Sequence, residues 1–231
     1  EKEFHKRLRE IEKLGVKFIE PSGPMTITNF RVLGKGYVGI VVSAQVEDGA
    51  SYALKIRRMD ADRINTFHEV KMLKKANSIK VGPTFHSYTK NFILMELIEG
   101  TAIPKWVANL KGRRRKARLK KTLREALTQC QRLDLIGLDH GELSQAPKHI
   151  IVDRKDTPRI IDFETASTNR KTSNLTSLCQ YLFIGSKLSL SVRKILGNID
   201  REGLIENLRK YKRNPHEQNF RRIISFIPLD R

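Results

Sequence analysis

Three glycines that lead into an apolar strand constrain the fold of this chain more than any other feature. They lie in the segment GKGYVGIV, residues 34–41, which fits the pattern G-x-G-x-x-G-x-V in full. In dinucleotide-binding folds such glycines open a helix. Here the β-branched residues after Gly39 continue as a strand instead. The sequence therefore predicts a glycine-rich hairpin whose backbone amides can approach a phosphate closely, because intervening side chains are missing.

Helix and strand patterns alternate over the first hundred residues. Hydrophobic residues recur with helical spacing over residues 3–14 and 62–76. The predicted strands are a β-branched, glycine-rich stretch from Ile27 to Val46, then Ser51–Ile56, Phe85–Tyr88 and Phe92–Leu97. Strands that follow one another through short turns are typical of an antiparallel sheet.

Helical patterns dominate after the break at Glu99-Gly100. Two short apolar runs, His149–Val152 and Arg159–Phe163, predict a second hairpin. The predicted helices span residues 114–136, 174–184, 187–197, 200–212 and 216–227. One apolar face of the first helix comprises Leu119, Leu123, Leu127, Cys130 and Leu133. The change in pattern predicts an N-terminal lobe of residues 1–99 and a C-terminal lobe of residues 100–231.

The charge of the chain is strongly basic. Lys and Arg number 45 against 25 Asp and Glu, which gives a formal net charge of +20. Nine of the basic residues lie between Lys111 and Arg124, where there is no acid. This segment is either a solvated helix face or a patch that contacts a phosphate backbone or an acidic partner, so RNA or ribonucleoprotein contact is one expectation. Aromatic residues are not interleaved with these charges, so stacking on single-stranded bases is not indicated.

Cysteine usage favours a reducing compartment, and the hydropathy of the chain favours the absence of a membrane segment. Its two cysteines, Cys130 and Cys179, each lie in an apolar segment and form no C-x-x-C metal pattern. No apolar run approaches the roughly 18 residues needed to span a bilayer. The first residues carry charges where a secretory signal would be apolar. We therefore expect a cytoplasmic protein without a membrane segment.

A lysine and a glutamate are spaced to meet beneath the predicted glycine hairpin. Lys55 interrupts the otherwise apolar strand pattern YALKI, so its ammonium needs a polar partner. Phosphate oxygens would supply one, and an edge strand facing water is the alternative. Glu69 follows 14 residues later on a predicted helix, with Leu73 one turn beyond it. The sequence favours pairing of these two charges.

Two acidic motifs occur in the second half of the chain. The first is HGEL, residues 140–143, and the second is IIDFE, residues 160–164, so that Glu142 and Asp162 are 20 residues apart. An aspartate that closes an apolar strand is costly unless it has a partner. A Mg²⁺ ion that bridges phosphates is such a partner.

Taken together and in this order, these motifs resemble those of atypical protein kinases. The likeness covers roughly residues 28–185 and extends to the RIO family, the KEOPS-complex kinase and a set of predicted archaeal Ser/Thr kinases. It implies an α+β, bilobal protein-kinase-like fold with an antiparallel β-sheet N-lobe and a reduced, mostly helical C-lobe. Only 67 residues follow Glu164, which fits the small C-lobe of those families.

The resemblance also implies ATP and Mg²⁺ as cofactors and assigns residue roles. The implied nucleotide-binding residues are Gly34, Lys35, Gly36, Tyr37, Val38, Gly39, Val41, Ala53, Lys55, Met95, Glu96 and Ile98. Of these, Met95 corresponds to the gatekeeper, and Glu96 and Ile98 correspond to the backbone contacts with adenine. Glu142, Lys55 and Glu69 are the implied catalytic residues. Asp162 is the implied metal ligand, with His149 as a weaker candidate.

The chain departs from the family pattern at its acidic motifs. Glu142 stands where the family usually has Asp, and it extends one methylene further. Glu164 stands where ordinary kinases have Gly, although residues other than Gly also occur there in the RIO family. Its carboxylate is a further candidate ligand.

The metal-binding Asn of the family has no direct counterpart. Five residues after the catalytic acid the chain has Pro147, which carries no ligand atom. In a second alignment a two-residue insertion brings His149 to that position, although Mg²⁺ favours oxygen over imidazole. Ser144 or Gln145 could substitute, and Lys148 could neutralise phosphate without a second metal. These alternatives stay open in the sequence.

The sequence therefore favours ATP-dependent phosphoryl transfer to a hydroxyl, with a Ser or Thr of a protein as acceptor and autophosphorylation included. One alternative is a nucleotide-binding pseudokinase or ATPase-type switch in a ribonucleoprotein complex. A second is a small-molecule kinase, which usually has a larger helical lobe. A basic RNA-binding α+β domain would require every motif to be a coincidence.

Overall fold

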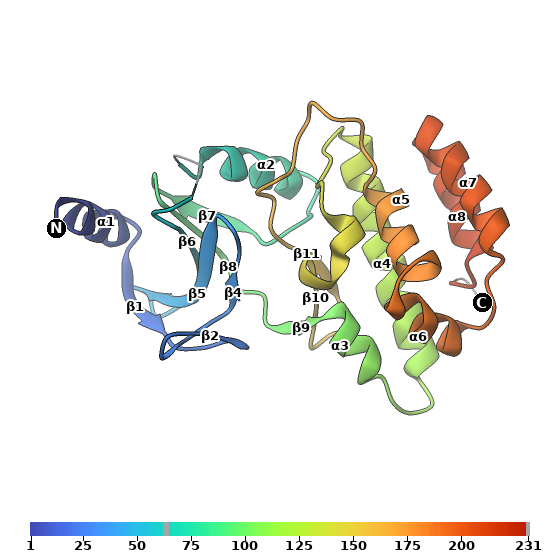
Figure 1. Cartoon of the computed structure of the whole chain (residues 1–231), viewed down its shortest axis with the longest axis horizontal. Helices are drawn as coiled ribbons and strands as arrows, with labels where there is room; N and C mark the ends of the chain where they lie inside the picture. Colours follow the sequence, from blue (N-terminus) through green and yellow to red (C-terminus); the bar gives the residue numbers. More distant parts are fainter. Residues whose placement is uncertain (62–64, 230–231) are drawn as a thin grey trace. The chain divides into compact units, whose positions relative to one another are not determined.

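The chain forms two compact units, which are described separately (Figure 1). The first comprises Glu1–Asn77 and Pro83–Ile98, and the second comprises Ser78–Gly82 and Glu99–Arg231. This computed structural model describes residues 1–61 and 65–229, without the side chains of residues 145 and 146. That residues 1–99 and 100–231 are separate domains stays a prediction.

The first unit is built on an antiparallel sheet. Its strand order is β1-β5-β6-β8-β7, with β4 also paired to β5 and a separate hairpin of β2 and β3. The strands are β1 (Val16–Glu20), β2 (Met25–Ile27), β3 (Phe30–Val32), β4 (Gly34–Lys35), β5 (Gly39–Val46), β6 (Ser51–Arg57), β7 (Phe85–Tyr88) and β8 (Phe92–Glu96). Alternate residues of β5, Val42, Ala44 and Val46, enter one hydrophobic core because side chains on a strand alternate between faces.

Two helices accompany this sheet. Helix α1 (Lys2–Lys13) precedes β1, and helix α2 (Phe67–Asn77) packs against β7. The predicted helix over residues 62–76 begins too early, since residues 65 and 66 are not helical and 62–64 lie outside the described residues. The Asn65 side chain accepts a hydrogen bond from the Phe67 amide (3.0 Å), which starts the helix at that point.

Helix α1 is fastened to the sheet by a buried carboxylate. Glu10, 8% exposed, accepts hydrogen bonds from the amide and the side-chain nitrogen of Asn91, at 2.9 and 2.7 Å. The Asn91 side-chain oxygen accepts in turn from Arg57 (2.9 Å) and Arg7 (3.3 Å). Asn91 therefore links the N-terminal helix to the turn before β8.

The second unit combines a small sheet with helices. Its three-stranded sheet has the order β11-β10-β9, formed by β9 (Gly100–Ala102), β10 (Ile150–Asp153) and β11 (Pro158–Ile160). The helices are α3 (Ile103–Ala108), α4 (Arg115–Leu135), the 3₁₀ helix η1 (Leu143–Lys148), α5 (Asn174–Cys179), the π-helix η2 (Gln180–Ile184), α6 (Lys187–Leu196), α7 (Arg201–Arg213) and α8 (Glu217–Phe226). Helix α4 packs against α5 and β11 (Figure 1).

The long helix α4 supplies the core of this unit. The face predicted from its spacing is confirmed, since all five of its residues are fully buried: Leu119, Leu123, Leu127, Cys130 and Leu133. Cys130 and Cys179 are both buried free thiols. Burial raises the pKa of each thiol above its usual value.

A buried aspartate at the end of α4 joins three helices. Asp134 accepts hydrogen bonds from the Asn174 side chain (2.8 Å), the Leu175 amide (3.1 Å) and the Tyr211 hydroxyl (3.1 Å). Burial raises the pKa of Asp134 above its usual value. The side chain of Asn174 also donates to the Leu138 carbonyl (2.7 Å) and accepts from the His140 amide (2.8 Å). Asn174, at the start of α5, thus fixes the backbone of the loop after α4 through Leu138 and His140.

Several elements differ from the sequence prediction. The strand predicted over 159–163 ends at Ile160, because Asp162 has φ +70°, which is incompatible with an extended strand. Strands β1 and β9 and helix α3 were not predicted. Strand β9 contains Gly100, where a Cβ atom would lie 2.4 Å from the Val152 carbonyl oxygen, so a glycine permits its close pairing with β10.

The link between α1 and the sheet predicts a pH-dependent stability. Glu10→Gln replaces one of the two carboxylate oxygens that accept from Asn91 by an NH2 group, which can only donate, and is expected to lower the free energy of unfolding by about 1–3 kcal/mol at neutral pH. Burial acts to raise the pKa of Glu10, but hydrogen bonds, including those from Asn91, and the charge of Arg7 outweigh it, so the pKa lies below 4.5. A lowered pKa stabilises the folded state above the unfolded pKa, and this contribution disappears as the pH falls.

Urea denaturation of the wild type and Glu10→Gln between pH 7 and pH 3 measures this effect. The stability difference is expected to be constant above about pH 5 and to shrink below it. Glu12→Gln, at an exposed position of the same helix, is the matched control. A difference that does not change with pH would contradict the assignment.

Candidate functional site

A buried ion pair lies in the centre of the first unit. Strand β6 is flanked by β5 and β8, with Lys55 opposite Val41 on one side and Ile93 on the other. The Lys55 Nζ lies 2.8 Å from the Glu69 Oε1, and both side chains are 8% exposed. The structure thus brings together the two charges that the sequence predicted to pair, and Lys55 is not on an edge strand. Removal of either partner would leave a buried charge uncompensated.

The glycine segment forms a tight turn in front of this pair. The Gly36 amide donates to the Gly39 carbonyl oxygen (2.8 Å), between strands β4 and β5. A Cβ atom at Gly39 would lie 3.1 Å from Lys55 Cε and 3.1 Å from the Ile56 carbonyl oxygen. Gly39 therefore leaves room for the Lys55 side chain, and no helix opens at the glycines. Tyr37, 74% exposed, lies at the tip of the turn.

The remaining nucleotide-binding candidates of this unit lie on neighbouring strands. Met95 on β8 is directly opposite Ala53 on β6. The Glu96 amide donates to the Thr84 carbonyl oxygen (2.8 Å), and the Glu96 carboxylate accepts from the Thr84 amide (2.8 Å). No sequence pattern indicated this role of the Glu96 side chain, which links the end of β8 to Thr84.

The second unit gathers its polar candidates around the β10–β11 hairpin. The His149 Nε2 lies 2.8 Å from the Glu142 Oε2, and its Nδ1 lies 3.9 Å from the Asp162 Oδ2. The Ile161 amide donates to the His149 carbonyl oxygen (2.9 Å), which extends the hairpin by one hydrogen bond. Glu142, His149 and Asp162 are therefore close together, although they come from three different turns.

His140 supports this group, a role that the sequence did not indicate. Its ring is fully buried and contacts the His149 ring edge-on, with centroids 5.5 Å apart. Burial lowers the pKa of His140 to about 4, so its imidazole is neutral at physiological pH. Since the Ile161 carbonyl oxygen, 3.0 Å away, can only accept, the Nε2 of His140 carries the proton.

The turn that carries Glu142 is held by a charged contact. Asp139 accepts from the Arg170 Nε (2.8 Å) and the Ser173 amide (3.0 Å). Gly141 has φ +92°, and a Cβ atom there would lie 2.5 Å from the Arg170 guanidinium. A glycine is therefore needed immediately before Glu142.

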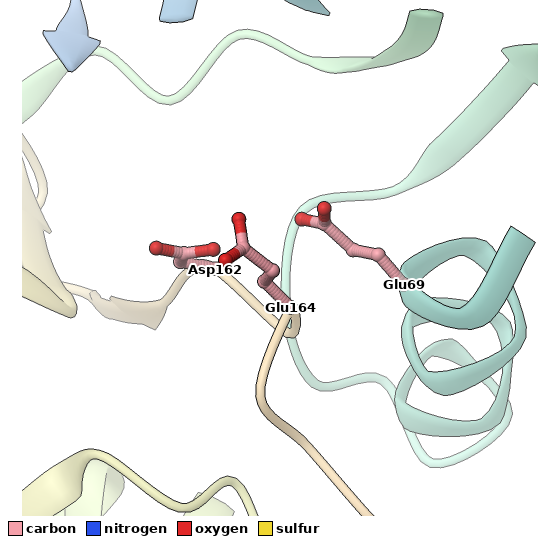
Figure 2. A group of neighbouring side chains, drawn as sticks. All are labelled: Glu69, Asp162 and Glu164. Carbon is pink, nitrogen blue, oxygen red and sulfur yellow. The ribbon is translucent and has the colours of Figure 1, made fainter. Parts of the chain in front are cut away.

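Asp162 and Glu164 could hold a metal ion. Figure 2 shows both on the segment after β11, whereas Glu69, also labelled there, comes from α2 of the first unit. Carboxylate oxygens of Asp162 and Glu164 lie within 4.8 Å of each other. Such oxygens suit Mg²⁺, so the donor set fits this ion. Asp162 adopts a left-handed backbone conformation (φ +70°), a strained geometry that is concentrated at functional sites.

Of the residues considered in place of the missing Asn, His149 lies near Asp162, with its Nδ1 3.9 Å from the Asp162 Oδ2. Pro147 lies inside the 3₁₀ helix η1. Ser144 and Lys148 are exposed, and the side chain of residue 145 lies outside the description. Their roles toward metal or phosphate stay predictions.

The comparisons with known proteins match the region that contains these residues. The family model described as RIO domain matches residues 40–179, more than half of the chain. This range includes Lys55, Glu69, Glu142 and Asp162 and begins just after Gly39. An archaeal relative, "Uncharacterized protein MJ1211" of Methanocaldococcus jannaschii, is 32% identical over 121 residues, which cover 52% of this chain and 99% of that protein.

The space beside Gly39 predicts a difference between two glycine substitutions. Gly39→Ala forces its Cβ against Lys55 and the Ile56 backbone and is expected to destabilise the protein by about 1–3 kcal/mol. Gly34→Ala is the matched control, because a Cβ atom at Gly34 has no neighbour within 4 Å among the described residues. Urea denaturation followed by circular dichroism measures both. Equal effects of the two substitutions would show that Lys55 does not need this space.

Proposed function

Because this chain belongs to the RIO domain family, an atypical kinase and ATPase-like family, we propose that it is an ATP-dependent phosphotransferase. In this proposal the γ-phosphoryl group of ATP moves to a Ser or Thr hydroxyl of a protein, including this protein itself. The observation that carries the proposal is the buried Lys55–Glu69 pair behind the glycine turn. A lysine fixed in this way presents its charge at one defined place, which positions phosphate groups.

The first unit is proposed to bind the nucleotide. Backbone amides of the glycine turn approach the phosphates, and Lys55, held by Glu69, neutralises them. Met95, with Ala53 opposite it, lines the adenine, which bonds to the backbone at Glu96 and Ile98. The proposed nucleotide-binding residues are Gly34, Lys35, Gly36, Tyr37, Val38, Gly39, Val41, Ala53, Lys55, Met95, Glu96 and Ile98.

The second unit is proposed to supply the metal ligands and the acid/base group. Asp162 and Glu164 would hold Mg²⁺ through carboxylate oxygens. Mg²⁺ bound there would neutralise charge on the phosphate oxygens. Glu142 orients the acceptor hydroxyl and accepts its proton during transfer. Its side chain is 40% exposed, which leaves it accessible to a hydroxyl from solvent.

A second candidate function is a nucleotide-dependent switch that does not phosphorylate another molecule. The observation that favours it is Pro147 within η1, which in the alignment without an insertion stands at the position of the family's metal-binding Asn and carries no ligand atom. Nucleotide binding and release would then change a partner's contacts instead of modifying the partner. The two functions differ in one measurable property, the transfer of phosphate to a hydroxyl.

Substitution of one charged residue in each unit tests the proposed transfer. Lys55→Ala and Asp162→Ala are each expected to lower transfer of γ-labelled phosphate at least about 100-fold, because electrostatic positioning supplies most of the rate in this chemistry. Lys194→Ala, at an exposed position on α6, is the control and should stay within about twofold of the wild type.

The same experiment separates the two candidate functions. If the wild type transfers label to protein, and Lys55→Ala and Asp162→Ala each abolish this transfer, the phosphotransferase function is supported. ATP bound by the wild type, with no label on any hydroxyl, contradicts transfer and supports the switch. Loss of label in Lys194→Ala as well would indicate a general loss of folded protein, which thermal denaturation of each variant checks.

We further propose that the basic segment from Lys111 to Arg124 contacts RNA. All but one of its nine Lys and Arg residues are exposed, and they occupy the start of α4 and the turn before it. One of them, Arg118, is paired with Asp156 at 2.6 Å. Clustered, exposed positive charge binds a phosphate backbone with little sequence preference. No helix in the part of the chain that the structure describes is long and apolar enough to cross a membrane.

Charge reversal in this segment tests the contact. A variant with Arg113, Arg114 and Lys116 replaced by Glu is expected to bind a model RNA at least tenfold more weakly at low salt and to show a smaller salt dependence. In the control variant, Glu replaces three exposed basic residues outside the segment, Lys194, Lys212 and Arg222, so that both variants change the net charge equally. Fluorescence anisotropy at several salt concentrations measures both. Equal weakening by the two triple variants would show that net charge alone, and not this segment, attracts RNA.

A further inference from the structure

We propose that His149 is a positioning residue, whose Nε2–H holds Glu142 in the orientation that phosphoryl transfer requires. This inference rests on the proposed transfer function. It replaces the weaker expectation that His149 is a metal ligand, and it concerns only residues of the second unit.

The pair joins a buried donor to a half-exposed acceptor. His149 Nε2 lies 2.8 Å from Glu142 Oε2, with 6% of the histidine side chain and 40% of the glutamate side chain exposed. A half-exposed glutamate samples several rotamers, and ordering it costs free energy. A hydrogen bond from a fixed, buried group removes that freedom for one carboxylate oxygen and leaves the other oxygen for the acceptor hydroxyl.

The imidazole of His149 is itself held in place. Its residue lies just before β10, and its carbonyl oxygen accepts from the Ile161 amide (2.9 Å). Its ring meets the His140 ring at 61°, and the His140 ring meets Phe163 with centroids 5.2 Å apart. His140 is in turn bonded to the Ile161 carbonyl (3.0 Å). This arrangement of rings gives His149 little room to rotate.

The geometry distinguishes the two ring nitrogens of His149. A carboxylate accepts hydrogen bonds, so the nitrogen that faces Glu142, Nε2, carries a proton. Nδ1 is buried and has no hydrogen-bond partner among the described residues. Its distance of 3.9 Å to the Asp162 Oδ2 is too long for a hydrogen bond. The hydrogen bond that His149 does make is therefore directed at Glu142, and imidazole suits Mg²⁺ poorly.

The pair connects two departures from the family pattern that are separate in the sequence. Glu142 has one more rotatable bond than the usual aspartate and so is harder to fix. His149 occupies a position near the place where the family has its metal-binding Asn. In the structure, the hydrogen bond from His149 restrains the longer side chain of Glu142.

Substitutions that mimic either nitrogen of the ring test this role. The amide nitrogen of His149→Gln can reach the position of Nε2, whereas that of His149→Asn reaches only the position of Nδ1. Phosphoryl transfer is expected to fall at least tenfold in kcat for His149→Ala and His149→Asn, with the KM for ATP changed less than twofold. His149→Gln should retain kcat within about threefold of the wild type.

Other outcomes overturn the proposal. Full activity of His149→Asn together with loss in His149→Gln would place His149 in the role of the metal-binding Asn. Equal activity of all three variants and the wild type would show that Glu142 needs no positioning. Thermal denaturation of each variant identifies any loss of the fold, and kcat is compared only between variants that unfold like the wild type.

A second measurement detects the hydrogen bond between His149 and Glu142 independently of phosphoryl transfer. In protein labelled with ¹⁵N-histidine, long-range ¹H–¹⁵N correlation spectra report which ring nitrogen carries the proton. We expect Nε2–H for His149 in the wild type and a shifted Nε2 resonance in Glu142→Ala. Protonation at Nδ1 alone, or an unchanged spectrum in Glu142→Ala, overturns the positioning role. If this signature is present but the wild type transfers no phosphate, the hydrogen bond is supported and the proposed function fails.

Discussion

A lysine buried in the middle of a β-sheet requires an opposite charge beside it, and the architecture of the first unit follows from this requirement. Lys55 lies on β6, between β5 and β8, where water cannot solvate it. Helix α2 supplies Glu69, and Gly39 leaves the volume that the lysine side chain fills. A buried ion pair adds little net stability, because desolvation offsets the attraction between the charges. The pair is better understood as a device that fixes one positive charge at a defined point.

The second unit contains two kinds of carboxylate, which differ in how deeply they are buried. Asp134 and Asp139 are almost fully buried and receive hydrogen bonds from helix α5 and the residues just before it, so they hold the backbone around His140. Glu142 and Asp162 remain half-exposed on that framework. Acids that organise the loop are thus distinct from acids that are open to chemistry. The loop does not depend on the groups that would have to move or exchange protons.

The sequence predicted the parts that repeat a pattern or match a motif. The glycine hairpin, the helix face from Leu119 to Leu133 and the α+β class of the fold were recognised in this way, and the RIO domain match supports the class. Strand β9 was missed because a strand of three residues is too short to show an alternating pattern of apolar and polar side chains. The need for its glycine comes from the backbone of Val152, which is 52 residues further along the chain. The Glu142–His149 contact was missed for another reason. It crosses a 3₁₀ turn that contains Pro147, and the geometry of such a turn is not encoded in residue spacing.

The burial of both cysteines has a practical consequence for studying this chain. Cys130 and Cys179 are enclosed in the helical core, and their thiolate forms are disfavoured. Neither cysteine is therefore expected to react rapidly with maleimide reagents while the protein is folded. A single cysteine introduced in place of the exposed Tyr37 would carry a fluorophore or spin label at the tip of the glycine turn. Such a label would report whether added ATP changes the motion of that turn, without first having to remove any natural cysteine.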